Sequence, residues 1–305
     1  MGKKHALKNG ISYGTLTRRF ARVTALTALF VLALVLIFPM IFTVSDSFMS
    51  EDEIAESYPV SNNADSMADN SDKASFNFKI IPEQVTLTQY YDVLVKNTQF
   101  LYLFWNSIKL TLPIVLGQVL IGSMAAYAFS VIRFKWREPL FFIYILVMMM
   151  PFQVTLVPNF IIASKLGLIN SYLSIILPGI FNTFGVFLLR QYMSYIPFSY
   201  IEAAKVEGAG HIRIFLKIIV PECKNGIAAL SILSFVDNWN MVEQPLIFLN
   251  DSLKEPLSIY LSKISQGQVG LAFAASAFYM LPVLLIFLYG IKYLMEGIQL
   301  SGTKM

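Results

Sequence analysis

A group of polar and aromatic side chains lies between positions 237 and 244, inside an otherwise apolar part of the chain. Asp237, Asn240 and Gln244 are spaced i, i+3 and i+7, so on a helix they share one face. Their neighbours in this group are Asn238, Trp239 and Glu243. Carboxylates and amides hydrogen-bond to hydroxyl groups, and an indole ring offers an apolar face to ring C–H groups. The pattern therefore predicts a wall that contacts a polyhydroxylated solute such as a sugar.

Other interpretations of this group stay open. Asp237 falls near the middle of an apolar stretch from about 226 to 248, where an isolated charge costs about 2.5 to 3.5 kcal/mol. Such residues usually face the interior of a helix bundle. They either line a hydrated pathway, tie neighbouring helices together, or lie at the outer interface of the membrane. Asp237 and Glu243 also have a spacing compatible with the carboxylate pair of a membrane hydrolase, but no nucleophile motif accompanies them.

A second group, between 191 and 224, is unusually regular for a connection between apolar stretches. Ser199 and Glu202 have the capping-box spacing, which predicts that a helix begins at this point. Ala203 and Ala204 keep one face of that helix small, so another backbone can approach it closely. A short helix of this kind is suited to a helix-in-groove contact with a partner protein.

Two glycines follow this predicted helix. Gly208 and Gly210 permit the turn that ends it, because glycine adopts left-handed backbone conformations without strain. A second helix is predicted over 211–220, and it runs to Pro221. The connection is therefore predicted to consist of two short helices.

The composition separates this chain from ordinary soluble domains. Of its 305 residues, 56% are hydrophobic and 14% are charged, whereas roughly a quarter are charged in a typical soluble domain. The basic residues behind the net charge of +4 are not interleaved with aromatic residues, which argues against a nucleic-acid partner. One cysteine and two histidines far apart in sequence exclude a disulfide scaffold and a histidine-based metal site. We therefore expect no catalytic residue, cofactor or metal.

Long uncharged stretches predict an all-α membrane protein. A bilayer requires about 20 apolar residues per helix. Stretches longer than this are 23–45, 110–132, 140–164, 166–189 and 264–291. A further stretch, 225–242, is interrupted by Asp237 and is counted as the fifth of six transmembrane helices. The first stretch is too long for a cleaved signal peptide and lacks an Ala-x-Ala site, so we expect it to be retained.

Charged residues in the connections predict the orientation. Residues 1–22 carry six Lys or Arg and no acid, whereas the loop 46–99 carries ten acids and three lysines. Because Lys and Arg resist translocation, we expect the N-terminus in the cytoplasm and the loop outside. With six helices the C-terminus is cytoplasmic as well. Within the loop, residues 57–75 are rich in Ser, Asn and Asp and are predicted to be disordered.

The second group also resembles a known motif. The residues that carry the resemblance are Glu202, Ala203, Ala204, Gly208, Ile218 and Pro221. Their spacing is similar to the EAA motif of ABC importer permeases, which reads EAA, three residues, G, nine residues, I, one residue, L and P. Val220 replaces the Leu of the motif. The group lies between the predicted fourth and fifth spans, where this family carries its EAA motif.

Further blocks resemble the carbohydrate branch of this family, specifically its maltose-permease-G-like subunits, from about Tyr90 to the C-terminus. They include Asn106-Ser107, Met150-Pro151-Phe152, Phe187-Leu188-Leu189-Arg190-Gln191 and Trp239-Asn240. Where many members read Trp-Asn-Asp-Phe, this chain has Met241 and Val242 in the last two positions. The resemblance therefore does not identify the sugar.

The resemblance implies a type I ABC importer permease fold, with a core over 100–292, an EAA coupling loop at 191–224 and a cytoplasmic tail at 293–305. It implies a transport subunit of the bacterial inner (cytoplasmic) membrane that lacks its own ATPase site. Its partners would be a second, maltose-permease-F-like permease, two cytoplasmic ATPase subunits and an extracytoplasmic sugar-binding protein. Gly302 and Lys304 in the tail either contact the ATPase or belong to a frayed, solvated end. The alternatives are the same transporter with a polyol or glycerol phosphate as its solute, and a six-span membrane hydrolase.

Overall fold

The computed structural model describes residues 13–58, 81–264 and 268–302, and the elements in these ranges are all helical. The chain divides into two compact units, residues 1–89 and residues 90–305. The boundary lies in the outer loop that the sequence predicts, and the second unit begins at the residue where the resemblance to ABC permeases begins.

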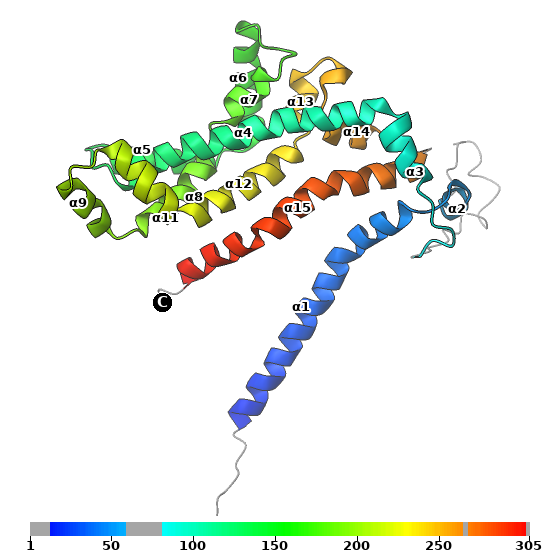
Figure 1. Ribbon diagram of the computed structural model, residues 1–305, viewed down its shortest axis with the longest axis horizontal. Helices are drawn as coiled ribbons and strands as arrows, with labels where there is room; N and C mark the ends of the chain where they lie inside the picture. The colour runs from blue at the N-terminus through cyan, green and yellow to red at the C-terminus, as the bar shows by residue number, and fades with distance from the viewer. Residues whose placement is uncertain (1–12, 59–80, 265–267, 303–305) are drawn as a thin grey trace, which may run out of the picture. The chain divides into compact units, whose positions relative to one another are not determined.

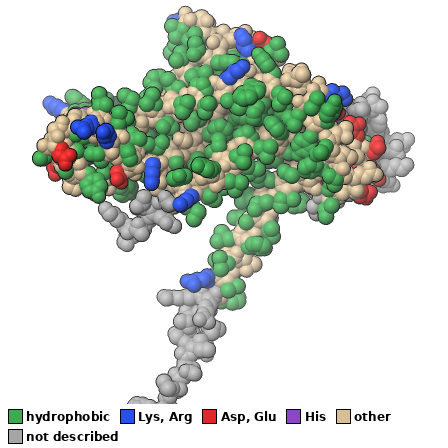
Figure 2. All heavy atoms as spheres, in the orientation of Figure 1, with side chains coloured by type: hydrophobic (Ala, Val, Ile, Leu, Met, Phe, Trp, Pro, Cys, Tyr) green, Lys and Arg blue, Asp and Glu red, His purple; other side chains and the backbone are tan. Residues whose placement is uncertain are grey.

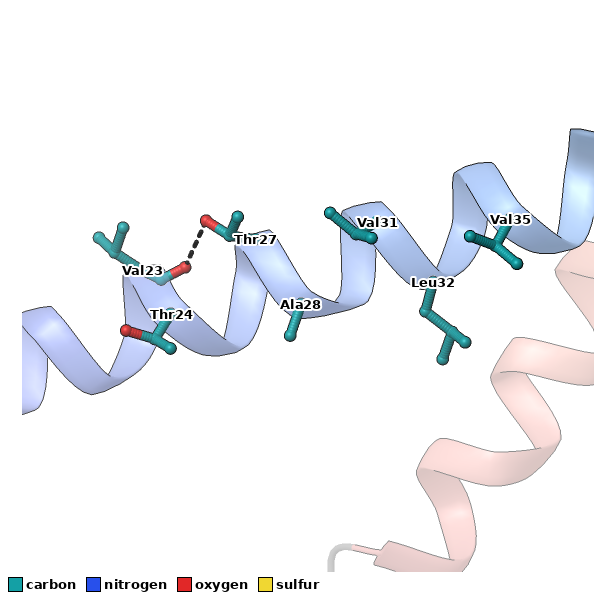
Figure 3. A pocket seen from close by; sticks show the side chains of 7 residues that line it. All are labelled: Val23, Thr24, Thr27, Ala28, Val31, Leu32 and Val35. Atoms are coloured by element: carbon teal, nitrogen blue, oxygen red, sulfur yellow. Dashed lines mark hydrogen bonds between the residues drawn. The ribbon is translucent and has the colours of Figure 1, made fainter.

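The first unit contains the long helix α1 (Tyr13–Asp46) and the short helix α2 (Glu51–Ser57). Residues 20–46 of α1 are long and apolar enough to cross a membrane, in agreement with the predicted first span. One stripe of α1 carries Val or Thr at every fourth position from Val23 to Val35, beside Thr24, Ala28 and Leu32 (Figure 3). The hydroxyl of Thr27 donates to the carbonyl of Val23 at 3.0 Å, which satisfies the hydroxyl within its own helix.

The chain after α1 is held by buried carboxylates. Asp46 is fully buried and accepts a hydrogen bond from the hydroxyl of Tyr58. The carboxylate of Glu53 accepts from the backbone amides of Glu83 and Gln84, at 2.9 and 3.5 Å. The bonds of Glu53 join residues before and after the segment 59–80. Most of the stretch predicted to be disordered, 57–75, lies outside the described residues, but Ser57 ends α2 and is buried.

The second unit is built around α4 (Thr98–Ser130). This helix packs against α8 (Thr183–Ser194) and α12 (Lys224–Trp239), and α12 packs against α15 (Val269–Gly302) (Figure 1). The shorter elements are α3 (Thr88–Tyr91), η2 (Asp92–Lys96), α5 (Arg137–Met148), α6 (Phe152–Lys165), α7 (Leu173–Gly179), α9 (Phe198–Val206), α10 (His211–Ile214), η3 (Phe215–Ile219), α11 (Val220–Glu222), α13 (Glu243–Phe248), η4 (Ser252–Lys254) and α14 (Leu257–Lys263).

The side chains of α4 take part in each of the three hydrophobic clusters of the described chain. Phe100 packs in a cluster with α14 and α15, and Leu110 in one with α7 and α13. Tyr127 packs in a cluster with α8, α9 and the segment from α10 to α12. The helix therefore connects the three parts of the core from its first turn to its last.

The number of spans depends on how bent helices are counted. Four helical stretches are long and apolar enough to cross a membrane, and two bent helix pairs raise the number to six. The predicted third span, 140–164, is not one straight helix, because α5 and α6 meet at an angle of 98°. Pro151 lies at this bend; it lacks a backbone N–H and disfavours the helical conformation of the residue before it. The second bent pair joins His211–Glu222 to α12 at an angle of 75°. The predicted fifth span is itself interrupted, because α12 ends at Trp239 and α13 begins at Glu243.

Hydrophobic side chains cover most of the middle of the face of the second unit seen in Figure 2, and charged side chains gather toward its edges. Exposed residues on α4 alone include Leu112, Leu116, Leu120 and Met124. An apolar surface of this extent is suited to lipid or to another apolar protein rather than to water.

Asn106 gives a test of this packing. Its side-chain amide donates to the carbonyls of Leu253 and Glu255, at 2.7 and 3.2 Å, and the residue is fully buried. Asn106→Leu leaves both carbonyls without this donor, so we expect the free energy of unfolding to fall by about 1–3 kcal/mol. Thermal unfolding of the purified chain in detergent measures the change. The exposed position Leu116 is the control, since Leu116→Ala should leave the transition within about 0.5 kcal/mol; equal losses would contradict the anchoring role.

Candidate functional site

The EAA segment (residues 191–224) folds as the predicted pair of short helices, but its first helix begins earlier than the capping box predicts. Pro197, rather than Ser199, occupies the N-cap of α9, and no side chain caps this end of the helix. Ser199 therefore lies within the first turn of the helix. The second helical stretch runs from His211 to Glu222 through α10, η3 and α11, close to the predicted 211–220.

The residues of the EAA motif divide between the inside and the outside of the segment. Ala204 is buried and Ile218 is partly buried, and both belong to the hydrophobic cluster that contains Tyr127. Glu202, Ala203, Gly208 and Pro221 are exposed. The two alanines therefore do not form one small face; Ala203 remains available to a partner, whereas Ala204 lets α9 lie close to the rest of the unit.

The turn after α9 depends on one of the two glycines. Gly208 has a φ of +80°, in the left-handed region, and its amide donates to the carbonyl of Lys205 at 3.0 Å. Gly210 has a φ of −73° and serves as the N-cap of α10. The predicted need for glycine is therefore confirmed at Gly208 and is not found at Gly210.

Two side chains, Tyr127 and Arg133, connect α4 and the residues after it to the EAA segment. The hydroxyl of Tyr127 lies 3.0 Å from Nδ1 of His211, and the Tyr127 ring lies 5.3 Å from that of Phe215. The guanidinium of Arg133 lies over the ring of Phe198, 4.7 Å from its centroid. These contacts hold the beginning of each short helix.

Arg190 is a structural residue of this region that the sequence analysis placed only within a family block. Its guanidinium forms an ion pair with Glu138 at 2.9 Å and stacks on Phe141, 3.6 Å from the ring centroid. Its Nε donates to the carbonyl of Phe129 at 3.2 Å. One side chain thus joins α8 to α4 and α5. The signal for this role was Glu138, the one acid beside Arg133, Lys135 and Arg137 in the loop after α4.

A polar hollow lies where the two broken helices meet. It measures about 660 Å³ and contains residues from the start of α6 and from the break between α12 and α13. The lining residues are Phe152, Gln153, Val236, Asp237, Asn238, Asn240, Met241, Val242, Glu243 and Gln244. The predicted pathway residues Asp237, Asn238, Asn240 and Gln244 are therefore brought together on this hollow. Gln153 is a lining residue that the sequence analysis missed, although it directly follows the family block Met150-Pro151-Phe152.

Trp239 does not line the hollow. Its side chain is only 1% exposed and stacks between the rings of Phe235 and Tyr279, at centroid distances of 5.4 and 5.5 Å. Its Nε1 donates to the carbonyl of Tyr279 at 3.3 Å. Trp239 fastens the end of α12 to α15, and Phe152 is the aromatic residue in the lining.

The residues of the predicted wall do not lie on one face of a single helix. Asp237 lies in the last turn of α12, which ends at Trp239, and not near the middle of a continuous span. Gln244 belongs to α13, so the spacing of seven residues does not describe one helix face. Across the break between the two helices, Gln244 nevertheless lines the same hollow as Asp237 and Asn240.

Side chains of neighbouring elements satisfy the backbone carbonyls at the end of α12. The hydroxyls of Thr111 and Tyr279 donate to the carbonyls of Asn238 and Trp239, at 3.3 and 2.9 Å. The hydroxyl of Ser258 donates to the carbonyl of Met241. The helix can therefore end here without leaving these acceptors unpaired.

Two further expectations from the sequence concern the C-terminal tail and metal binding. Gly302 is the last residue of α15, and Lys304 lies outside the described residues. In the described part of the chain, no group of three or more His, Cys, Asp or Glu side chains could hold a metal ion.

Comparison with known proteins gives a family, relatives and a fold neighbour. Residues 118–297 match the family described as binding-protein-dependent transport system inner membrane component. The arabinooligosaccharides transport system permease protein AraQ of Halalkalibacterium halodurans is 30% identical over 226 residues, which are 73% of this chain and 81% of the relative.

Two further relatives are named for different kinds of solute. The lactose transport system permease protein LacG of Rhizobium radiobacter is 31% identical and covers 66% of this chain and 74% of its own. The sn-glycerol-3-phosphate transport system permease protein UgpE of Pectobacterium atrosepticum is 30% identical, with 66% and 73% covered. A solved structure, of a bacterial ABC transporter involved in the import of the acidic polysaccharide alginate, shares the fold with a TM-score of 0.75. The two chains are 22% identical, and the match covers 96% of this chain and all of the other.

The two glycines of the EAA segment provide a matched pair of substitutions. A Cβ at either position meets no atom within 4 Å, so space does not distinguish them. Gly208→Ala should destabilise the turn by about 1–2 kcal/mol, because a Cβ disfavours the left-handed conformation, whereas Gly210→Ala should not. Hydrogen exchange of the backbone amides in residues 198–222 measures the difference. Equal exchange in the two variants would show that the turn does not need a left-handed residue.

Proposed function

Because this chain belongs to the family of binding-protein-dependent transport system inner membrane components, we propose that it is a permease subunit of an ATP-driven importer of sugars or oligosaccharides. The polar hollow at the two helix breaks carries this proposal. Transporters commonly build their solute sites from discontinuous membrane helices, because backbone and polar side chains are exposed there within an apolar protein. Amide and carboxylate groups in the hollow supply hydrogen-bond partners for sugar hydroxyls.

The relatives support carbohydrate import over the alternatives. AraQ and LacG are permeases named for arabinooligosaccharides and lactose. These relatives are transport proteins, which favours a transport role for the carboxylates Asp237 and Glu243 over the hydrolase alternative. The UgpE relative keeps glycerol phosphate as the second candidate solute.

The proposed complex contains a second permease, two ATPase subunits and an extracytoplasmic binding protein. In this proposal the ATPases bind the exposed side of the EAA segment, which presents Glu202 and Ala203 together with Val206 and Ile212, 88% and 77% exposed. Exposed apolar side chains beside charged ones suit a helix-in-groove contact. ATP hydrolysis belongs to these partners, and this chain is the transport subunit.

The proposed topology follows from the same assignment. We count α5 with α6 as one span and α12 as another, beside the four long helical stretches, so six spans cross the bacterial inner membrane and both termini are cytoplasmic. The EAA segment then lies on the cytoplasmic side, with the basic residues that favour this side.

The structure suggests how movement of the EAA segment reaches the hollow. The ATPases would push on α9, and the contacts of Tyr127 and Arg133 would pass this displacement to the end of α4. The other half of α4 holds the end of α12 through Thr111. A single helix therefore contacts both the proposed coupling site and the proposed solute site.

The proposed function is tested by reconstituting the purified complex in liposomes and measuring uptake of labelled arabinooligosaccharides and lactose. Uptake should require ATP and the binding protein. ATP-independent uptake, or the absence of uptake with every sugar offered, would overturn the proposal.

Glu202 tests the coupling surface. Glu202→Lys reverses a charge on the exposed side of α9, and we expect loss of most ATP-driven uptake while the chain remains inserted, because the docking surface changes and the core does not. Glu207→Lys is the matched control, since Glu207 is also exposed but lies in the turn after α9. Uptake and solute-stimulated ATPase activity are measured in the same liposomes. Normal activity of the Glu202→Lys complex would rule out this surface as the docking site.

Gln244 tests the solute site. Gln244→Leu removes an amide from the hollow, so we expect uptake to fall at least about tenfold while the complex still assembles. Gln118→Leu provides the contrast, because the buried Gln118 amide donates to the carbonyl of Gly179 at 2.8 Å and its loss should impair assembly. Size-exclusion chromatography and uptake distinguish the two effects. If Gln244→Leu instead prevented assembly, its role would be helix packing.

A further inference from the structure

We infer that the polar hollow selects uncharged, hydroxyl-rich solutes and disfavours anions, an inference that rests on the proposed function and deepens it. The transport relatives include both kinds of solute, since lactose is uncharged and glycerol phosphate is an anion. The sign of the charge around the hollow distinguishes between them.

The lining of the hollow carries negative charge without a basic counterpart. Asp237 and Glu243 are carboxylates, and Lys, Arg and His are absent from the ten lining residues. Within the described residues, neither carboxylate takes part in an ion pair. Glu243 instead accepts long hydrogen bonds of 3.4 Å from the side-chain amide of Gln153, which is neutral.

The helix ends around the hollow do not offset this charge. The N-terminus of α6, where Phe152 and Gln153 lie, contributes a partial positive charge of about one half. The C-terminus of α12, capped by Asn240, contributes about the same partial charge with the opposite sign. The N-terminus of the short helix α13, where Glu243 and Gln244 lie, adds a further positive partial charge of at most about one half. The three helix ends together therefore leave no more than about half a positive charge against two full carboxylate charges. A phosphate or a uronate in the hollow would therefore meet like charge at short range.

The remaining lining groups match a sugar. The amides of Gln153, Asn240 and Gln244 can each donate to and accept from hydroxyl groups, and the carboxylates accept from them. Phe152 and Met241 add an apolar surface for ring C–H groups. The volume of about 660 Å³ lies within the range of about 300–1,000 Å³ that is usual for small-molecule sites.

The charge of the hollow is measurable with thiol reagents of opposite charge. The protein is the assembled transporter in liposomes, with Gln244→Cys as the introduced thiol and Cys223→Ala to remove the one cysteine of this chain. The probes are a trimethylammonium and a sulfonate methanethiosulfonate, and each rate is divided by the rate with free 2-mercaptoethanol. The same complex without the introduced cysteine supplies the background.

We expect the cationic reagent to react about tenfold faster or more, after this normalisation, because a cleft lined by one sign of charge concentrates counter-ions. Asp237→Asn combined with Glu243→Gln should bring the ratio of the two rates close to one. An unbiased ratio, a faster anionic reagent, or a cationic preference that survives the double substitution would overturn the inference. If neither reagent reacted with the cysteine, with nucleotide present or absent, the inference would also be overturned, since the hollow would then be closed to solutes.

These outcomes are separate from those of the proposed function. If the unsubstituted complex takes up sugar with ATP and the Gln244→Cys complex shows no charge preference, the proposed function is retained and the inference is lost. If the Gln244→Cys complex shows the predicted preference and the unsubstituted complex takes up no sugar, the charge of the hollow is retained and the importer assignment is lost.

Discussion

The structure depends on satisfying the backbone where α12 ends inside an apolar helix bundle. A helix that stops leaves its last carbonyls without intrahelical partners, and no water is available in hydrocarbon to replace them. Here the partners are hydroxyls from three other elements: Thr111 on α4, Ser258 on α14 and Tyr279 on α15. Beside these paired carbonyls, Asp237, Glu243 and Gln244 line the hollow. The helix break that borders the site is therefore compatible with the apolar surroundings, because its carbonyls are paired.

The same constraint explains the importance of α4. Thr111 and Tyr127 lie on this one helix, 16 residues and so about 24 Å apart, and they contact α12 and the EAA segment respectively. A helix whose side chains belong to all three hydrophobic clusters cannot move at one end without affecting its neighbours at the other. This arrangement supports coupling between the proposed ATPase contact and the proposed solute site through one rigid element.

The residues that support the hollow are different from the residues that line it. The helix breaks and the pairing of their backbones are built from residues such as Pro151, Thr111 and Tyr279, which do not themselves line the hollow. The lining side chains can change in charge without disturbing these supports. In this chain they carry two carboxylates beside neutral amides, and in the proposed site the resulting field, rather than the fold, would distinguish sugars from acidic solutes.

The sequence by itself determined the helical class, the long apolar stretches, the two short helices of the EAA segment and the need for glycine at position 208. These features depend on consecutive residues, because a local run decides hydropathy and a single residue decides whether a positive φ is strained. Only the tertiary structure decided that Trp239 is buried, that Ala204 faces inward while Ala203 does not, and that Gln153 joins the hollow. Burial and pairing depend on partners far away in the chain: Tyr279, which covers Trp239, lies 40 residues later. Periodicity carries no information about such a partner, so the position of the helix break and the lining of the site emerge only when the helices pack.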